Sequence, residues 1–278
     1  MEKRIGVFDS GLGGLTVLKE LVRELPEENY FVFGDTKNMP YGVRESKDIC
    51  NLTEEGFNKL YEKGIKALVI ACNTATVHGL ENLQSKTDIP VIGVIEPGVL
   101  SATNAGCENI LVLGTEATIN SGLIQRLLKE KNPNVKVEGI GAPEMVLAVE
   151  NGEAQTEIGR KVVYKYLDQS NIEPDCVMLS CTHFPALEHF IIEYYHEKDK
   201  MIKIINPAKK CAELVKEALE DRNELNESDE KGLIEYYTSG DTDSYTKGGN
   251  AILGGEILIR ETNNLWLKNY LKVIYFLV

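Results

Sequence analysis

Two cysteines occupy matching positions in the two halves of the chain. Cys72 follows the apolar run 68–71 and Cys181 follows the apolar run 177–180, and small polar residues come directly after each cysteine. Each arrangement predicts a buried strand that ends at a thiol and leads into a helix. Two thiols on opposite sides of one carbon atom could remove a proton from one face and return a proton to the other. That is the chemistry of racemisation.

Cys72 needs activation if it is to act as a base. A free thiol has a pKa of about 8.5 and is mostly protonated at neutral pH. Asn73 and Thr74 predict the first turn of a helix, and the unpaired N–H groups of a helix N-terminus favour a thiolate. A lone cysteine at such a place is commonly a buried, inert residue, but the matching second cysteine argues against that alternative.

Cys181 has a candidate partner in its own turn. Thr182 and His183 follow it directly, where the strand would end and a helix would begin. The His183 imidazole could pair with the thiol or stabilise its thiolate. The alternative is a histidine at a helix start that is bonded only to the backbone.

A glycine-rich turn follows the first predicted strand and spans residues 9–14. Glycines allow the backbone to approach an anion closely, and the helix that follows attracts negative charge to its N-terminus. Asp9 and Ser10 stand at the strand tip, where Asp9 could act as an acid/base neighbour and the turn could bind a carboxylate. A purely structural tight turn is the alternative.

Two further segments carry weaker signals. The turn 38–42 could offer backbone amides and the Tyr41 hydroxyl to a ligand, with Pro40 and Gly42 fixing its backbone, although such a segment is more often only a loop. Thr115 and Thr118 could bind a ligand or simply cap a helix. Glu150 ends a predicted helix and, taken alone, is typical of a solvated glutamate.

Short apolar runs alternate with longer segments of helical period, which predicts an α/β fold with mostly parallel sheets. Ligands bind such sheets at the carboxyl ends of strands, where both cysteines would lie. The expected strands are 5–8, 30–34, 67–71, 90–95, 109–113, 135–140, 175–180, 201–205 and one near 233–238. The expected helices include 15–25, 46–63, 116–131, 153–168 and 207–220.

A weak internal repeat relates the strand and turn near residue 5 to those near residue 110. We therefore expect two similar, open, mostly parallel-sheet α/β domains related by pseudo-symmetry, with the active site in the cleft between them. The first domain would comprise residues 1–95 and 207–257, the second residues 96–206, and residues 258–278 would form a C-terminal tail of unknown role.

Composition narrows the class of protein. The 278 residues carry a net charge of -13, which disfavours a nucleic-acid binder. No apolar run approaches the roughly 20 residues that span a bilayer, and Lys268 and Lys272 interrupt the apolar tail, so no membrane partner is expected. We also expect no signal peptide before the first strand. We therefore expect a cytoplasmic protein whose six scattered cysteines are reduced thiols.

Together, these segments resemble the glutamate racemases of the cofactor-independent aspartate/glutamate racemase superfamily. The resemblance covers about residues 4–255, and the pair of cysteine motifs is its most specific part. The matching stretches are Phe8-Asp9-Ser10-Gly11-Leu12-Gly13-Gly14, Pro40-Tyr41-Gly42, Ala71-Cys72-Asn73-Thr74-Ala75 and Leu179-Ser180-Cys181-Thr182-His183-Phe184-Pro185.

The resemblance implies the role of each matched residue. Cys72 would act on D-glutamate and Cys181 on L-glutamate, with Asp9 assisting Cys72 and with His183 and Glu150 assisting Cys181. It also implies a small-molecule substrate, no pyridoxal phosphate or metal, a role in supplying D-glutamate for peptidoglycan, and a homodimer. The implied substrate contacts are Asp9, Ser10, Tyr41, Gly42, Asn73, Thr74, Thr182 and His183, and we add Pro40, Thr115 and Thr118 as candidate contacts from their local patterns.

Four other functions remain open at this point. One is an aspartate or other amino-acid racemase of the same superfamily. A second is a zinc-dependent hydrolase or lyase that uses Cys72, Cys181 and His183 as ligands. A third is an amidohydrolase with a Cys-His-Glu arrangement, and a fourth is a non-catalytic binding module for amino acids or nucleotides.

Overall fold

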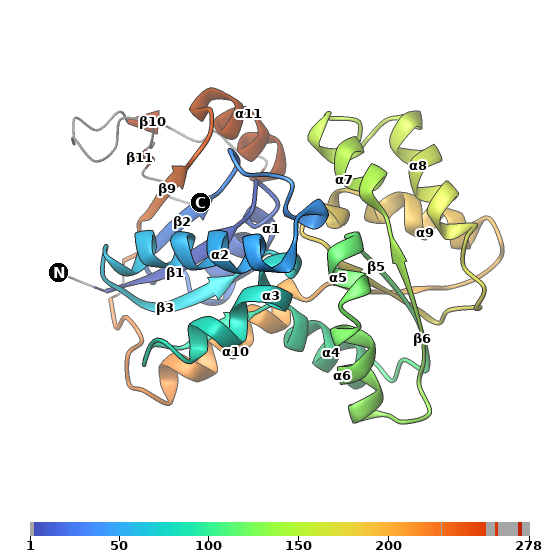
Figure 1. The fold of residues 1–278 in the computed structure, drawn as a ribbon, viewed down its shortest axis with the longest axis horizontal. Coiled ribbons are helices and arrows are strands. Elements are labelled where there is room, and N and C mark those ends of the chain that lie inside the picture. The colour runs from blue at the N-terminus through green and yellow to red at the C-terminus, as the bar shows by residue number, and fades with distance from the viewer. Residues whose placement is uncertain (1–2, 229, 254–258, 261–271, 274–278) are drawn as a thin grey trace. The chain divides into compact units, whose positions relative to one another are not determined.

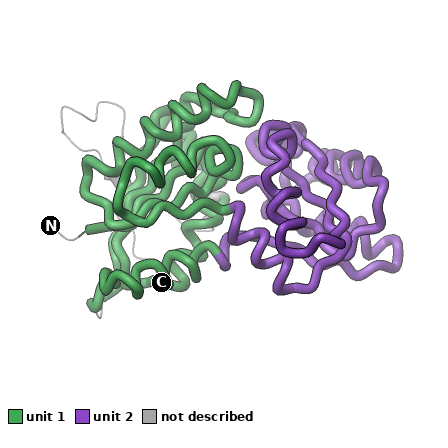
Figure 2. Tube along the Cα trace, turned by 60° about the horizontal axis from the view of Figure 1, so that its bottom comes forward, with its two compact units in different colours: residues 1–94, 211–278 green, residues 95–210 purple. Residues whose placement is uncertain are grey.

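The computed structural model describes residues 3–228, 230–253, 259–260 and 272–273 (Figure 1). The chain divides into two compact units, one formed by residues 1–94 and 211–278 and the other by residues 95–210 (Figure 2). Each unit contains a parallel sheet flanked by helices. The prediction of an α/β fold with parallel sheets is confirmed.

Unit 1 is built on a five-stranded parallel sheet with the order β4-β3-β1-β2-β9. Its central strands are buried along almost their whole length, as the uninterrupted apolar runs require. The strands are β1 (Arg4–Asp9), β2 (Tyr30–Gly34), β3 (Ile65–Ile70), β4 (Val91–Gly93) and β9 (Ile234–Thr238). The helices are α1 (Leu15–Glu24), η1 (Tyr41–Val43), α2 (Ser46–Tyr61), α3 (Asn73–Gln84), α10 (Ala208–Glu220, which starts at the end of unit 2) and α11 (Thr242–Leu253).

Unit 2 is built on a four-stranded parallel sheet with the order β6-β5-β7-β8. Side chains of β5, β7, α7, α8 and α9 form one buried apolar cluster in this unit. The strands are β5 (Asn109–Gly114), β6 (Lys136–Gly141), β7 (Cys176–Ser180) and β8 (Lys203–Ile205). The helices are α4 (Ile95–Asn104), α5 (Glu116–Asn120), α6 (Leu123–Lys131), α7 (Pro143–Glu150), α8 (Glu157–Leu167), η2 (Phe184–Leu187) and α9 (Glu188–His196).

The weak sequence repeat corresponds to a repeat in topology. Counted along the chain, the first four strands of each unit take the order second, first, third, fourth, and unit 1 adds β9 beside its second strand. In each sheet the second strand lies on one side of the first strand and the third strand lies on the other side, and such a switch in strand order is where open α/β sheets bind ligands. Cys72 follows the third strand of unit 1, and Cys181 follows the third strand of unit 2.

The expected strands are all present, and their ends lie within two residues of the predicted positions. The helix predicted over 116–131 is wrong, because two helices, α5 and α6, occupy that stretch. Gly122 separates them with a φ of 68°, a left-handed conformation that a regular helix excludes and that glycine adopts readily. The helix predicted from residue 153 begins at Glu157 instead.

A buried ion pair lies inside unit 1. Lys66 of β3 contacts Glu28 at 2.7 Å, and the two side chains are 6% and 2% exposed. The Glu28 carboxylate also accepts the Asn226 N–H at 2.7 Å. These bonds fix the segment that precedes β9 beside the start of β2.

The chain ends are described only in part. Ile259–Arg260 (β10) pairs antiparallel with Lys272–Val273 (β11). The rest of the predicted tail, residues 258–278, lies outside the described residues. In the part of the chain that the structure describes, no helix has both the length and the apolar character needed to cross a membrane.

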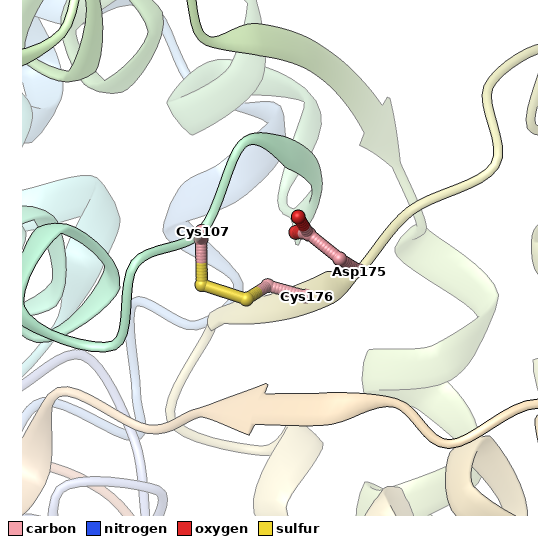
Figure 3. Close-up of side chains that lie close together, drawn as sticks. All are labelled: Cys107, Asp175 and Cys176. Carbon is pink, nitrogen blue, oxygen red and sulfur yellow. A yellow bond between two sulfur atoms is a disulfide. The ribbon is translucent and has the colours of Figure 1, made fainter.

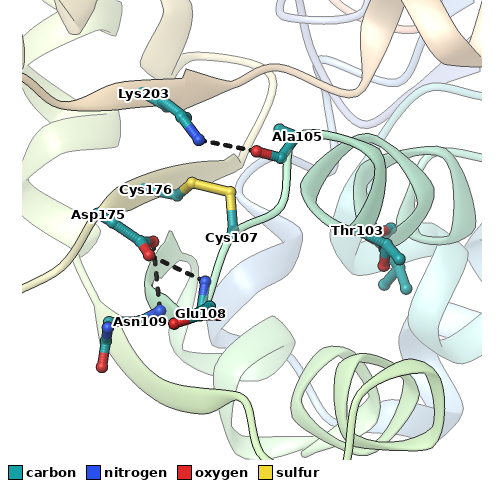
Figure 4. The surroundings of a disulfide bond; sticks show 9 residues. Thr103, Ala105, Cys107, Glu108, Asn109, Asp175, Cys176 and Lys203 are labelled. Carbon is teal, nitrogen blue, oxygen red and sulfur yellow. Dashed lines mark hydrogen bonds between the residues drawn. A yellow bond between two sulfur atoms is a disulfide. The ribbon is translucent and has the colours of Figure 1, made fainter.

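The expectation that all six cysteines are free thiols is wrong, because Cys107 and Cys176 form a disulfide (Figure 3). Cys107 lies just before β5 and Cys176 begins β7, so the neighbouring strands bring together two residues that are 69 positions apart. The Asp175 carboxylate accepts the backbone N–H groups of Glu108 and Asn109 at 2.9 and 3.2 Å (Figure 4). Both sulfurs and both carboxylate oxygens therefore already have partners, and we interpret this group as structural.

Candidate functional site

Cys72 lies at the start of α3, where the backbone turns out of β3. It is the N-cap of that helix, and its Sγ accepts the Ala75 N–H at 3.4 Å. The Ser10 Oγ lies 3.2 Å from the same sulfur, so the hydroxyl can donate to a thiolate or accept from a thiol. The side chain is 6% exposed. A helix start and a hydroxyl beside the sulfur can both stabilise a thiolate at this position.

Asp9 ends β1 and is 3% exposed. Its Oδ1 accepts the Gly11 N–H at 2.7 Å, which closes the glycine-rich turn around the carboxylate. A Cβ atom at Gly14 would lie 2.5 Å from the Asp9 Cβ, so only glycine allows α1 to begin this close to the strand tip. The glycine-rich turn therefore holds Asp9 and Ser10 at the carboxyl end of the sheet.

The turn after β2 brings Tyr41 to the same edge of the sheet. Tyr41 is 1% exposed, and its hydroxyl donates to Asp35 Oδ2 at 2.6 Å. Burial and the Asp35 carboxylate raise the pKa of Tyr41 well above its usual value, and charge on Cys72 and Asp9 adds to the shift. The Tyr41 hydroxyl is therefore close enough to Cys72 and Asp9 for their charges to affect it. Its hydroxyl proton is directed to Asp35, and its oxygen lone pairs remain for a ligand donor.

In unit 2, His183 lies between a thiol and a carboxylate. Its Nδ1 is 3.7 Å from Cys181 Sγ, and its Nε2 contacts Glu150 Oε1 at the end of α7. His183 and Cys181 are each 6% exposed. The local pattern around Glu150 is typical of a solvated glutamate, whereas the resemblance implied that it assists Cys181, and the structure places it against the His183 imidazole. The two partners are 33 positions apart in the chain.

The environment of His183 favours its charged form. Burial alone would lower the pKa of His183, but hydrogen bonds to Cys181 and Glu150 and the charge of these partners raise that pKa well above its usual value. A protonated imidazole beside a thiol stabilises the thiolate and can return a proton to it. This is a second route to an active cysteine, different from the helix start at Cys72.

Other predicted residues follow the ends of β3, β5 and β7. Thr115 caps α5, because its Oγ1 accepts the Thr118 N–H at 3.2 Å, and Thr118 is fully buried. Asn73 and Thr74 form the first turn of α3, and Thr182 is 8% exposed beside Cys181. The capping role that the sequence left open for Thr115 is thus the observed one, and a ligand contact there stays a prediction.

Each unit therefore brings together its own part of the predicted set. Unit 1 gathers Asp9, Ser10, Tyr41 and Cys72 at the carboxyl ends of β1, β2 and β3. Unit 2 gathers its residues at the carboxyl end of β7 and the end of α7, namely Cys181, Thr182, His183 and Glu150.

Sequence reasoning missed two polar residues at these edges. Asp35 follows β2 directly and is 3% exposed, and an acidic residue straight after a buried strand was the available signal. Ser180 ends β7 beside Cys181, and its buried hydroxyl has no hydrogen-bond partner among the residues that the structure describes. No pattern in the sequence marks Ser180, since it reads as part of the strand.

Comparison with known proteins identifies the family. The Asp/Glu/Hydantoin racemase profile matches residues 5–215. A glutamate racemase of Listeria monocytogenes serotype 4a is 40% identical over 244 residues, which cover 87% of this chain and 91% of that protein. The chain belongs to the Asp/Glu/hydantoin racemase family. It is an amino-acid racemase and thus an isomerase, and the resemblance to glutamate racemases is confirmed.

Solved structures agree with this assignment. Glutamate racemase isoform RacE1 from Bacillus anthracis superposes with a TM-score of 0.87 at 33% identity, covering 96% of this chain and 99% of that one. The glutamate racemase of Francisella tularensis, solved in complex with D-glutamate, gives a TM-score of 0.85 at 29% identity and covers 92% and 95% of the two chains.

The Cys181–His183–Glu150 chain taken alone would also suit a cysteine nucleophile with a histidine base. Family membership decides against an amidohydrolase and against the zinc hydrolase, since relatives spanning most of the chain are racemases. The geometry fits the family's reaction, because each unit supplies one thiol in a setting that can stabilise its thiolate.

Proposed function

We propose that this protein interconverts L-glutamate and D-glutamate by moving protons between substrate and two cysteines, without a cofactor. The observation that carries the proposal is the repeated placement of the two thiols. Each follows the third strand of its own sheet, at the switch point, with a separate means of stabilising negative charge. Relatives that cover nearly the whole chain are glutamate racemases.

The reaction begins with one cysteine as thiolate and the other as thiol. The thiolate takes the α-proton, and the electron pair of the broken C–H bond remains on the α-carbon as a planar carbanion. The opposite thiol then gives its proton to the other face and becomes the new thiolate. The product enantiomer leaves the enzyme with the two protonation states exchanged, so a turnover in the reverse direction restores them.

The carbanion requires donors aimed at the substrate carboxylate, because no electron sink takes part in the proposed step. The glycine-rich turn and the first turns after Cys72 and Cys181 present backbone N–H groups at the strand ends. Ser10, Thr74 and Thr182 lie in these turns. The proposed substrate contacts are those that the resemblance implies, with Asp9 and His183 placed to assist proton transfer.

The proposed assignment of faces follows the family. Cys72, assisted by Asp9, would act on D-glutamate, and Cys181, assisted by His183 and Glu150, would act on L-glutamate. The protein would work as a cytoplasmic homodimer that supplies D-glutamate for peptidoglycan. The net charge of -13 disfavours a nucleic-acid partner.

The first test is incubation of the purified protein with L-glutamate in D₂O. Loss of the α-proton signal and decay of optical rotation should occur together with glutamate and not with L-aspartate or L-glutamine. Equal or faster reaction with aspartate would point to an aspartate racemase instead. Tight binding of glutamate without exchange at the α-carbon would point to a binding module.

The roles of the cysteines are tested by Cys72→Ala and Cys181→Ala. Each variant should lose racemisation, yet each should still eliminate the leaving group from one enantiomer of a β-substituted glutamate, because that reaction needs one base. Cys50→Ala, at a half-buried free thiol of α2, is the matched control and should keep full activity. Normal racemisation by either active-site variant would overturn the mechanism.

A further inference from the structure

We propose that Asp35 is a positioning residue that fixes the loop carrying Tyr41 beside Cys72 and thereby sets the affinity for the amino-acid substrate. This inference rests on the proposed function, since it concerns the same site. Asp35 follows β2 directly, is 3% exposed, and donates its backbone N–H to the Asp9 carbonyl at 2.9 Å.

The Asp35 carboxylate joins two segments that are far apart in the sequence. It accepts the Tyr41 hydroxyl at 2.6 Å and the Asn38 amide at 3.0 Å, both from the turn after β2. It also accepts the Ser239 hydroxyl at 2.5 Å, from the turn after β9. Among the described residues these donors are all neutral, so Asp35 acts as an acceptor for several hydrogen bonds and has no cation to neutralise it.

Other bonds hold the same two turns together independently of Asp35. The Ser239 Oγ accepts the Lys37 N–H at 3.0 Å, and the hydroxyls of Thr36 and Thr238 lie 2.6 Å apart. Loss of the carboxylate should therefore leave the two turns attached while it releases Tyr41. This separation makes the role of Asp35 testable apart from the fold.

Tyr41, which Asp35 holds, lies beside the residues of the proposed site in unit 1. The η1 segment that begins at Tyr41 lies beside α3, whose N-cap is Cys72. The Tyr41 ring also contacts Phe8, with 6.4 Å between ring centroids, one residue before Asp9. A shift of Tyr41 would thus disturb the wall of the site next to both Cys72 and Asp9.

In unit 2 the segment after the second strand also carries a residue that lies against the cysteine site. Ala142 follows the second strand of unit 2 and donates its N–H to the Gly114 carbonyl at 2.8 Å, as Asp35 does to Asp9 in unit 1. The segment after that strand ends at Glu150, which reaches His183 directly. Unit 1 instead places Tyr41 in that segment and holds it through Asp35.

An asparagine at position 35 has nearly the same shape but only one acceptor oxygen, and its NH₂ group would face donors. Hydrogen bonds to charged groups are worth enough to alter binding about ten- to a hundredfold. The Asp35→Asn variant should therefore raise KM for both enantiomers of glutamate by about that factor. Its kcat should stay within about threefold, because in the proposed site Tyr41 would contact the bound substrate and would take no part in the proton transfer.

Three further variants make the test decisive. Tyr41→Phe combined with Asp35→Asn should cost no more than Asp35→Asn alone, since Asp35 acts through the Tyr41 hydroxyl. Thr36→Val removes a hydrogen bond from the same pair of turns and should leave KM unchanged. Ser239→Ala removes one donor to the carboxylate together with the Lys37 bond between the turns, and it should give a smaller rise in KM; it serves if Asp35→Asn does not fold, with Thr36→Val as the control for the lost bond between the turns.

Different results would reject the proposed racemase activity and the positioning role of Asp35. Absence of racemisation in the wild type would reject the proposed function, and calorimetric binding of D-glutamate would then report on Asp35 by itself. An active wild type with unchanged KM in both Asp35→Asn and Ser239→Ala would reject the positioning role. An equal rise in KM for Thr36→Val would show that Asp35 only supports the fold.

Discussion

The disulfide between Cys107 and Cys176 should be a major source of stability for unit 2. It closes a loop of 69 positions that lies wholly within that unit. The chain-entropy relation for a loop of this length gives about 4 kcal/mol, because the cross-link restricts the unfolded chain. Replacing both cysteines with alanine in Cys107→Ala/Cys176→Ala should remove most of this contribution.

The assay needs a control for the loss of buried sulfur. Cys107 and Cys176 are 5% and 0% exposed, so truncation also removes packing. Cys211 is a free thiol that is equally buried, and Cys211→Ala measures that packing cost without any cross-link. Urea unfolding followed by circular dichroism should show a much larger loss for the double variant than twice the loss for Cys211→Ala. Adding a reductant should bring the wild type close to the double variant.

Alkylation of the unfolded protein measures how many of the six cysteines are free thiols and so tests the disulfide directly. Without reductant, the unfolded wild type should take up label at four cysteines, namely Cys50, Cys72, Cys181 and Cys211, and at all six after reduction. Since disulfides are rare in a reducing cytosol, the same count on rapidly quenched cells would establish the state of the bond in vivo. Six labelled thiols in the oxidised protein would refute the reasoning, as would a double variant that loses no more than the control.

Three further predictions concern other parts of the molecule. Lys66→Met should cost about 3 to 5 kcal/mol in urea unfolding, because it leaves the Glu28 carboxylate buried without its cation, and a double variant that also replaces Glu28 with leucine should recover part of that loss. The raised pKa of His183 means that its protonated form stabilises the fold fully below about pH 6.5, and that this stability is lost as pH rises through the folded-state pKa. The free-energy difference between wild type and Glu150→Gln should therefore shrink with rising pH, and a difference that grows instead would contradict the charge pairing. Gly122→Ala should lower stability by about 1 to 2 kcal/mol through its left-handed backbone, which thermal unfolding can measure.

The sequence determined the elements of this protein closely. Alternating apolar runs and helical periods predicted every strand of the two parallel sheets, because strands covered on both faces are mostly apolar, but they did not predict the short pair β10 and β11. The two cysteine turns were also visible, since a strand end followed by small polar residues defines a helix start locally. Only features with a local cause were predicted in this way, and the break at Gly122 was missed because glycine is also tolerated inside helices.

Tertiary structure decided which residues meet. Ser10 reaches Cys72 across 62 positions because β1 and β3 are neighbours in the sheet, and strand order depends on how the helices between them cross over. The same cause places Cys107 against Cys176 through the pairing of β5 with β7. Glu150 and Asp35 carried no distinctive local pattern, since an isolated acidic residue looks the same whether water or a buried partner faces it. The resemblance implied a role for Glu150, but the contacts of both residues follow only from the groups that the fold brings within hydrogen-bond distance.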